Sequence, residues 1–154
     1  MNKHLISILF LLSALTLSAQ TAAELDILLE TQEVSAAKAA RFVLGSAGLL
    51  PAGLSGAAAE TAAWDTANSN GWLERGAADF VTLKDTAFLV MGAFEFRGGL
   101  MYSLFRNPRY AYREMVYRKI IQGRADPAMT VSGTRLLHII GRSLAYSGDE
   151  GDYQ

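Results

Sequence analysis

The chain has 154 residues, no cysteine and a formal net charge of −1 at pH 7. The lack of cysteine excludes disulfides, thiolate metal sites and a lipid-modified cysteine anchor together. About 130 residues would remain after removal of an N-terminal signal, which is enough for one domain with a hydrophobic core. The high alanine content favours closely packed helices over strands.

Residues 1–20 have the features of an export signal. Lys3 supplies the positive start, residues 5–17 form an apolar run, and small residues suited to cleavage follow at 18–23. The run is too short to span a bilayer comfortably, because that needs ~20 apolar residues. We therefore expect a protein exported to the periplasm or cell envelope, with no stable transmembrane segment after cleavage. An uncleaved N-terminal anchor is the alternative.

From Ala22 the sequence predicts a short amphipathic helix. Its early acids, Glu24 and Asp26, suit the positive end of a helix dipole. The apolar residues expected on one side of this helix are Leu25, Leu28 and Leu29.

The middle of the chain alternates loops and helices. Residues 45–56 contain four glycines and Pro51, which indicates a loop. An alanine-rich helix is expected over residues 57–70. Residues 94–105 leave two alternatives open, because the glycine pair at 98–99 could turn a hairpin or separate two short helices.

Residues 107–144 read as a complete helix-loop-helix unit. Asn107 and Pro108 form a favourable helix start, and Pro127 ends that unit's first helix together with Gly123. Ser132 is placed to cap the second helix. The apolar residues expected to face the core are Ala111, Met115 and Ile121 in the first helix and Leu136, Leu137, Ile140 and Leu144 in the second.

Two upstream segments repeat the second helix of this unit. The pair Val131-Ser132 aligns with Val81-Thr82 and with Val34-Ser35, so that the capping residues are 47 and 50 positions apart. Thr82 with Asp85 approximates a capping box. Positions five, eight and twelve after each cap are all apolar and are expected to be buried: Ala40, Val43, Ala47, Ala87, Val90, Phe94, Leu137, Ile140 and Leu144. The pattern predicts an all-α fold of tandem helix-loop-helix repeats packed as a small single-domain helical bundle. Chance alignment of capped amphipathic helices is the alternative.

The last copy resembles an S-layer homology repeat, a module of cell envelopes. Tyr110-Ala111 stands at the aromatic-alanine helix start, residues 120–123 at the turn, and Val131-Ser132 at the Ile-Thr pair of the second helix. Gly133 and Arg135 depart from the family's Thr-Arg-Ala-Glu helix start, and the family's ligand-contacting arginine is absent from all three caps. The resemblance implies three repeats in a pseudo-threefold helical bundle that binds anionic wall polymers.

The resemblance covers residues 24–144, about two and a half units. We therefore expect three segments: a signal peptide at 1–20, a helical repeat domain at 21–146 and a disordered acidic tail at 147–154.

Charge is distributed unevenly along the chain. Residues 20–95 contain four basic and ten acidic residues, whereas residues 96–142 contain nine basic and two acidic ones. Arginine binds carboxylate or phosphate bidentately, and tyrosine can lie against a sugar face. The candidate glycan-binding residues are Arg106, Arg109, Tyr110, Tyr112, Arg113, Tyr117, Arg118 and Arg124. The alternative is that these arginines solvate one helix face and pair with acids of the first half.

The same mixture in a cytoplasmic protein would suggest nucleic acid. Export argues against that partner, because the polyanions outside the cytoplasm are glycans, lipid headgroups and peptidoglycan carboxylates. The expected partner is therefore an anionic wall polymer or another envelope protein, and not nucleic acid.

Residues suited to catalysis are scarce. His138 is the only histidine after the signal, and it lies among apolar residues. The carboxylate pairs Glu60/Asp65 and Glu74/Asp79 are each five residues apart, which does not place them on one helix face. We expect no enzyme activity, no cofactor and no metal. The favoured function is an exported, non-enzymatic envelope module that binds an anionic wall glycan or peptidoglycan. A structural or protein-interaction domain without a glycan ligand is the alternative, and a glycan-cleaving enzyme is a third.

Overall fold

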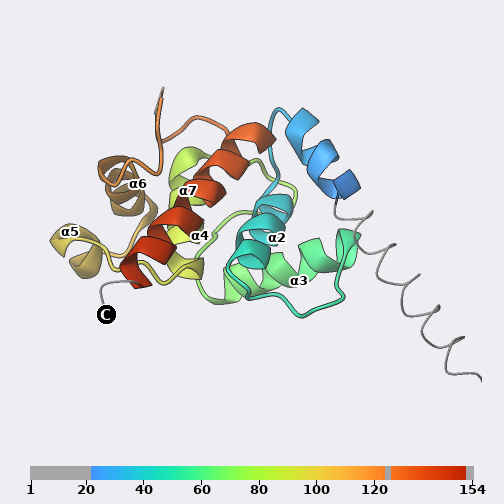
Figure 1. Ribbon diagram of the computed structural model, residues 1–154, viewed down its shortest axis with the longest axis horizontal. Coiled ribbons are helices and arrows are strands. Elements are labelled where there is room, and N and C mark those ends of the chain that lie inside the picture. The colour runs from blue at the N-terminus through green and yellow to red at the C-terminus, as the bar shows by residue number, and fades with distance from the viewer. Residues whose placement is uncertain (1–21, 124–125, 152–154) are drawn as a thin grey trace, which may run out of the picture.

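Figure 1 shows the computed structural model of the protein, which describes residues 22–123 and 126–151. The expected export signal and Arg124 lie outside these residues. Within them every regular element is an α-helix, apart from two isolated antiparallel bridges. The prediction of a small all-α helical bundle is confirmed.

The helices follow the expected order along the chain. A first helix covers residues 22–30. The others are α2 (Ala36–Ser46), α3 (Gly56–Ser69), α4 (Leu83–Ala93), α5 (Leu100–Leu104), α6 (Pro108–Tyr117) and α7 (Gly133–Gly151). The predicted loop joins α2 to α3, and the stretch that could have been a hairpin contains the short helix α5.

The expected disordered tail needs correction. Helix α7 continues through Gly151, so residues 147–151 are helical rather than disordered, while 152–154 lie outside the described residues. Tyr146 packs edge-on against Phe96, with ring centroids 5.2 Å apart. This contact holds the second half of α7 against the bundle and gives the helix a reason to extend past residue 146.

Three helices begin with the capping residues that the sequence indicates. The Ser35 hydroxyl accepts from the Lys38 N–H at 3.4 Å, and the Ser132 hydroxyl accepts from the Arg135 N–H at 3.3 Å. The Thr82 N–H donates to Asp85 Oδ2 at 3.0 Å. These bonds satisfy amides that a helix start leaves without a partner.

The residues just before these caps meet in a closed ring. The Val34 N–H donates to the Val131 carbonyl at 2.9 Å, that of Val81 to Val34 at 3.0 Å, and that of Val131 to Val81 at 3.2 Å. All three valines are fully buried. Three segments far apart in the sequence therefore occupy equivalent positions around one point. We call these three residues the valine ring.

A second cyclic set of hydrogen bonds surrounds the ring. In each case the first residue of a helix donates its N–H to the carbonyl of a residue that precedes the valine of another copy. The bonds are Ala36 to Asp79 at 2.8 Å, Leu83 to Met129 at 2.9 Å, and Gly133 to Thr31 at 2.9 Å. The three copies are thus joined cyclically through their backbones, as tandem repeats.

The helices pack so that each copy is joined to the next. Helix α2 lies against α3, and α4 lies against α6 (Figure 1). The start of α7 lies against the first helix, where a Cβ on Gly133 would come within 1.7 Å of the Leu28 carbonyl oxygen. A glycine is therefore required at the position where the S-layer homology pattern has arginine.

The buried faces agree with most of the predicted positions. Ala40, Val43, Ala87 and Val90 are fully buried, and Ile140 nearly so. Ala47, Phe94 and Leu137 are half-buried at the edge of the core.

Two predicted core residues are in the wrong place. Leu144 is 47% exposed and so is Leu29. In α7 the buried positions include Ile140 and Ser143, and the next residue along a helix points roughly 100° away. Leu144 consequently turns outward, although its spacing of four from Ile140 had suggested the same face.

Candidate functional site

Helix α6 presents the basic region that the sequence singles out. The Asn107 side chain accepts from the Tyr110 N–H at 3.1 Å, and Pro108 opens the helix, as predicted. Ala111 and Met115 are fully buried, which confirms these two as its core face. The remaining face is consequently directed toward solvent.

Three of the candidate residues share that exposed face. Arg109 and Arg113 are exposed, and Tyr117 is 84% exposed. Arg113, Tyr117 and the half-buried Tyr110 line one hollow of ≈ 290 Å³ between α5 and α6. Its other lining residues are Gly99, Leu100, Met101, Tyr102 and Glu114. We call this the α5–α6 hollow.

Arg118 has a different environment. Its side chain is 10% exposed, forms an ion pair with Glu114 at 2.8 Å, and donates to the Arg97 carbonyl. The guanidinium also lies over the rings of Phe96 and Tyr146, at 6.0 and 4.8 Å from their centroids. Arg118 therefore joins α6 to α7 and to the turn before α5, and the structure does not bring it together with the exposed arginines.

The other candidate residues also lie in different environments. Tyr110 stacks on Phe105, with centroids 5.9 Å apart. Tyr112 is half-buried against the core. Arg124 lies outside the described residues.

Arg106 borders a second hollow, of ≈ 410 Å³, which also involves Trp72, Phe88 and Glu95. Tyr102 lies between the two hollows and lines both. Its burial raises the pKa of the Tyr102 hydroxyl, and the positive charge of Arg106 opposes part of that rise.

The exposed arginines of the candidate site keep their positive charge. Among the described residues, no carboxylate forms an ion pair with Arg106, Arg109 or Arg113. Acids of the first half pair instead with arginines of the first half: Glu24 with Arg41 at 2.7 Å, and Asp85 with Arg75 at 3.0 Å. The charges of these three arginines are therefore available to bind an anion.

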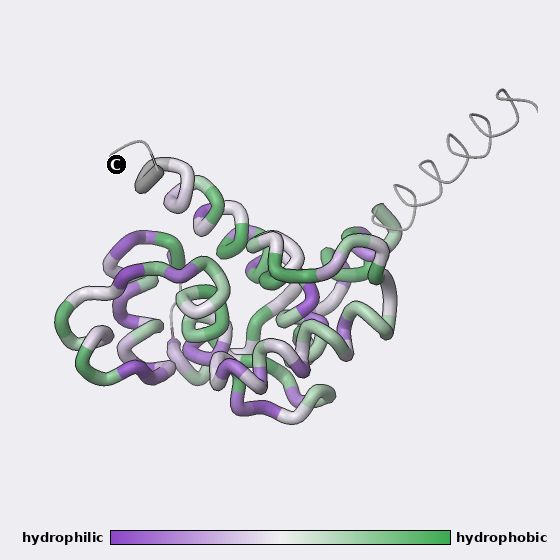
Figure 2. Tube along the Cα trace, turned by 90° about the horizontal axis from the view of Figure 1, so that it is seen from below, coloured by the Kyte–Doolittle hydropathy of each residue, from purple (hydrophilic) through white to green (hydrophobic). Residues whose placement is uncertain are grey.

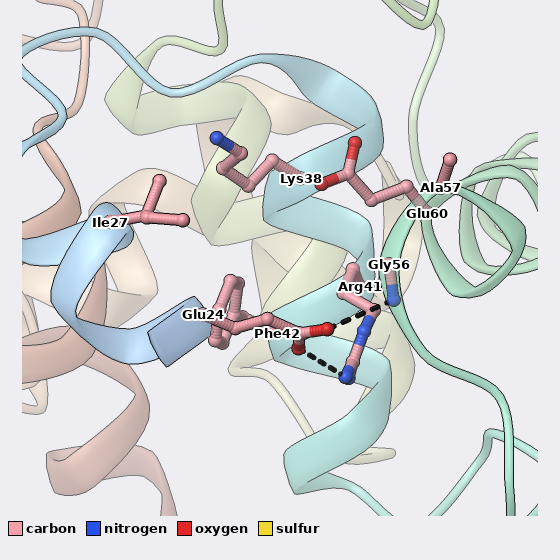
Figure 3. Close-up of a pocket in the computed structure, with 8 residues that line it drawn as sticks. All are labelled: Glu24, Ile27, Lys38, Arg41, Phe42, Gly56, Ala57 and Glu60. Atoms are coloured by element: carbon pink, nitrogen blue, oxygen red, sulfur yellow. Dashed lines mark hydrogen bonds and ion pairs between the residues drawn. The ribbon is translucent and has the colours of Figure 1, made fainter. Parts of the chain in front are cut away.

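A third hollow, of ≈ 230 Å³, lies between the first helix, α2 and the start of α3 (Figure 3). Glu24 reaches across it, pairs with Arg41 and accepts from the Gly56 N–H at 2.9 Å. Glu24 thus stabilises a helix start as an acid should, but that of α3 rather than that of its own helix. Glu24 and Arg41 therefore pair with each other in this hollow, while Arg41 Nε is buried without a hydrogen-bond partner.

The sequence-based reasoning missed a group of exposed apolar side chains beside the basic face. They are Leu100 (76% exposed), Met101 (53%), Leu104 (64%) and Phe105 (54%). The available signal was the lack of any acid between Glu95 and Glu114, together with an apolar run bounded by arginines.

The residues considered for catalysis are dispersed. His138 is exposed on α7, and Asp79 is exposed in the loop before α4. Within residues 22–123 and 126–151, no group of three or more histidine or acidic side chains is placed to hold a metal ion. None of the helices in this part of the chain has the length and apolar character needed to cross a membrane.

Taken together, fold and site define a small helical-repeat domain with one basic, aromatic face. Comparison of the chain with protein-family models, with curated proteins and with solved structures found no match.

Proposed function

We propose that the protein is an exported, non-enzymatic cell-envelope module that binds an anionic wall glycan or peptidoglycan through the exposed face of α6. The observation that carries the proposal is the α5–α6 hollow, where Arg113 and three tyrosines line one cavity. A guanidinium recognises carboxylate or phosphate, while tyrosine rings offer flat apolar surface to a sugar.

The charge of this face supports the same ligand class. Arg109 and Arg113 are four residues apart on one side of α6, so both can reach the same polyanion. Tyr117 follows Arg113 by another turn and is almost entirely exposed, at 84%. A large aromatic side chain left in water next to uncompensated arginines is typical of a binding surface rather than of a packed one.

The cyclic arrangement of the three copies gives further support. Three helix-loop-helix copies around the valine ring are the architecture that the resemblance to S-layer homology repeats implies. The ligand-contacting arginine of that family has no counterpart at the caps of this chain. The proposal therefore assigns binding to arginines of α6 and not to the helix starts.

The test is co-sedimentation of the mature protein with purified wall sacculi at low and moderate salt. We expect salt-sensitive binding by the unmodified protein and at least a tenfold loss for Arg113→Gln combined with Tyr117→Ala. Arg118→Ala is avoided as a test variant because its ion pair and ring contacts are part of the packing.

A matched control removes one cation and one exposed apolar side chain from a distant surface. Lys38→Gln with Leu49→Ala meets this condition, because Lys38 is half-buried on α2 and Leu49 is 44% exposed in the following loop. Equal loss of binding in both variants, or no binding by the unmodified protein, would overturn the glycan proposal. A lack of binding by the unmodified protein would favour a protein partner in the envelope instead.

A further inference from the structure

An apolar tip projects from the molecule next to the proposed glycan site. Helix α5 is only five residues long, yet two of its leucines are among the most exposed apolar side chains of the described chain: Leu100 at 76% and Leu104 at 64%. Met101 and Phe105 are more than half exposed beside them. We call these four residues the α5 tip.

The position of the tip makes it accessible to a broad surface. Figure 1 places α5 at the edge of the bundle, at the opposite end from the first helix. Figure 2 shows apolar stretches at this same end directly beside strongly polar ones. Because α5 lies at the edge, its apolar side chains can enter a flat layer while the other helices keep their positions.

Exposed arginines flank the tip on both sides. Arg97 and Arg106 bound it in the sequence, Arg109 is the second residue of α6, and all three are exposed. No acid occurs between Glu95 and Glu114. Glu114, which lies on α6 itself, pairs with Arg118 at 2.8 Å, and Glu95 borders the hollow that Arg106 lines.

We propose that the α5 tip docks the protein on an anionic phospholipid bilayer, with its apolar side chains in the interface and the flanking arginines on the headgroups. Apolar residues at the acyl boundary combined with cations at headgroup level are the chemistry of peripheral membrane binding. Arginines that surround the tip meet opposite charge on such a surface and would be left unpaired against a neutral one.

A polysaccharide does not account for the tip. Aromatic rings stack on sugars, but Leu100, Met101 and Leu104 are aliphatic and offer a glycan neither a flat ring nor a hydrogen bond. The membrane site thus shares Leu100 and Met101 with the α5–α6 hollow and extends beyond it at Leu104 and Phe105. It rests on exposure and charge at α5, and it stands whether or not α6 binds glycan.

The experiment is flotation of the mature protein with vesicles of phosphatidylcholine alone or mixed with phosphatidylglycerol. We expect binding to the mixed vesicles, weakened by salt, and little binding to the neutral ones. Leu100→Ser with Leu104→Ser should reduce binding to mixed vesicles at least tenfold, because these side chains supply the inserted apolar area. Arg106→Gln should reduce it about fivefold through the lost headgroup contact.

Leu49→Ser with Leu54→Ser is the matched control, since both leucines are exposed in the loop between α2 and α3. All variants change exposed side chains, and circular dichroism verifies that they are folded. Unchanged flotation of the Leu100→Ser, Leu104→Ser variant would overturn the proposal. So would failure of the unmodified protein to bind mixed vesicles, or equal binding to both kinds.

Further measurements distinguish membrane docking from glycan binding and from dimerisation. Leu104→Ser alone should lose vesicle binding and keep any sacculus binding, because Leu104 does not line the α5–α6 hollow. Arg113→Gln with Tyr117→Ala should show the reverse preference. A concentration-dependent dimer in sedimentation velocity that Leu104→Ser abolishes would instead assign the tip to a second copy of the chain and refute membrane docking.

Discussion

At the scale of single residues, Gly133 shows how a close backbone approach determines residue type. Its N–H donates to the Thr31 carbonyl at 2.9 Å, and an added Cβ would come within 1.7 Å of the Leu28 carbonyl oxygen. Gly133→Ala should therefore lower the free energy of unfolding by about 1–3 kcal/mol, measured by urea denaturation. Gly141→Ala is the control, because nothing lies within 4 Å of its Cβ position, and it should stabilise α7 by about 0.5–1 kcal/mol. Equal stability of Gly133→Ala and the unmodified protein would show that the first helix does not pack against Gly133.

Also at this scale, Tyr102 connects stability to alkaline pH. Burial raises the pKa of its hydroxyl, so the folded state favours the neutral form more than the unfolded state does. The stabilisation is complete below pH ~10 and is lost as the pH rises past that value. Thermal denaturation from neutral to alkaline pH should show a steeper loss for the unmodified protein than for Tyr102→Phe. Tyr117→Phe removes the same hydroxyl from an exposed ring and is the control. An identical loss of stability with pH for Tyr102→Phe and the unmodified protein would contradict a raised pKa of the Tyr102 hydroxyl.

At the scale of elements, α7 shows why a spacing pattern alone misplaces a face. Leu136 is fully buried whereas Leu144 is 47% exposed, although both fit an apolar stripe in the sequence. Leu136→Ala should cost ~2–5 kcal/mol of unfolding free energy, and Leu144→Ala no more than about 1 kcal/mol. Guanidinium denaturation of both variants measures the difference. Similar costs for the two substitutions would mean that α7 is rotated from the face described.

Helix α6 illustrates the same point for the candidate site. Its start at Asn107 and its buried Ala111 and Met115 follow from capping and spacing rules, so its exposed face was predictable. Arg118 was included among the ligand-binding residues only because it belongs to a basic run. Its partners Phe96 and Tyr146 come from other elements, and no local pattern in the sequence indicates that they meet.

At the scale of the whole molecule, the valine ring makes the three copies interdependent. Each of its hydrogen bonds joins two different copies, so opening any copy breaks two bonds of the ring. Native-state hydrogen exchange should give the amides of Val34, Val81 and Val131 the same free energy of opening, equal to that of global unfolding. The amide of Gly53, in the exposed loop between α2 and α3, should exchange far faster. Much faster exchange at Val34 than at the other two valines would show that the first copy opens independently.

The sequence by itself determined the local features: the helix starts at Ser35, Thr82, Asn107 and Ser132, the repeat of their spacing, and the concentration of arginine after residue 96. These depend on interactions within a few residues, which short patterns encode. Tertiary structure alone decided that three valines form a closed ring, that Arg118 packs between aromatic rings, and that Leu100 and Leu104 remain in water. Each of these outcomes depends on which surfaces distant segments cover, and burial of that kind is a property of the whole packed chain.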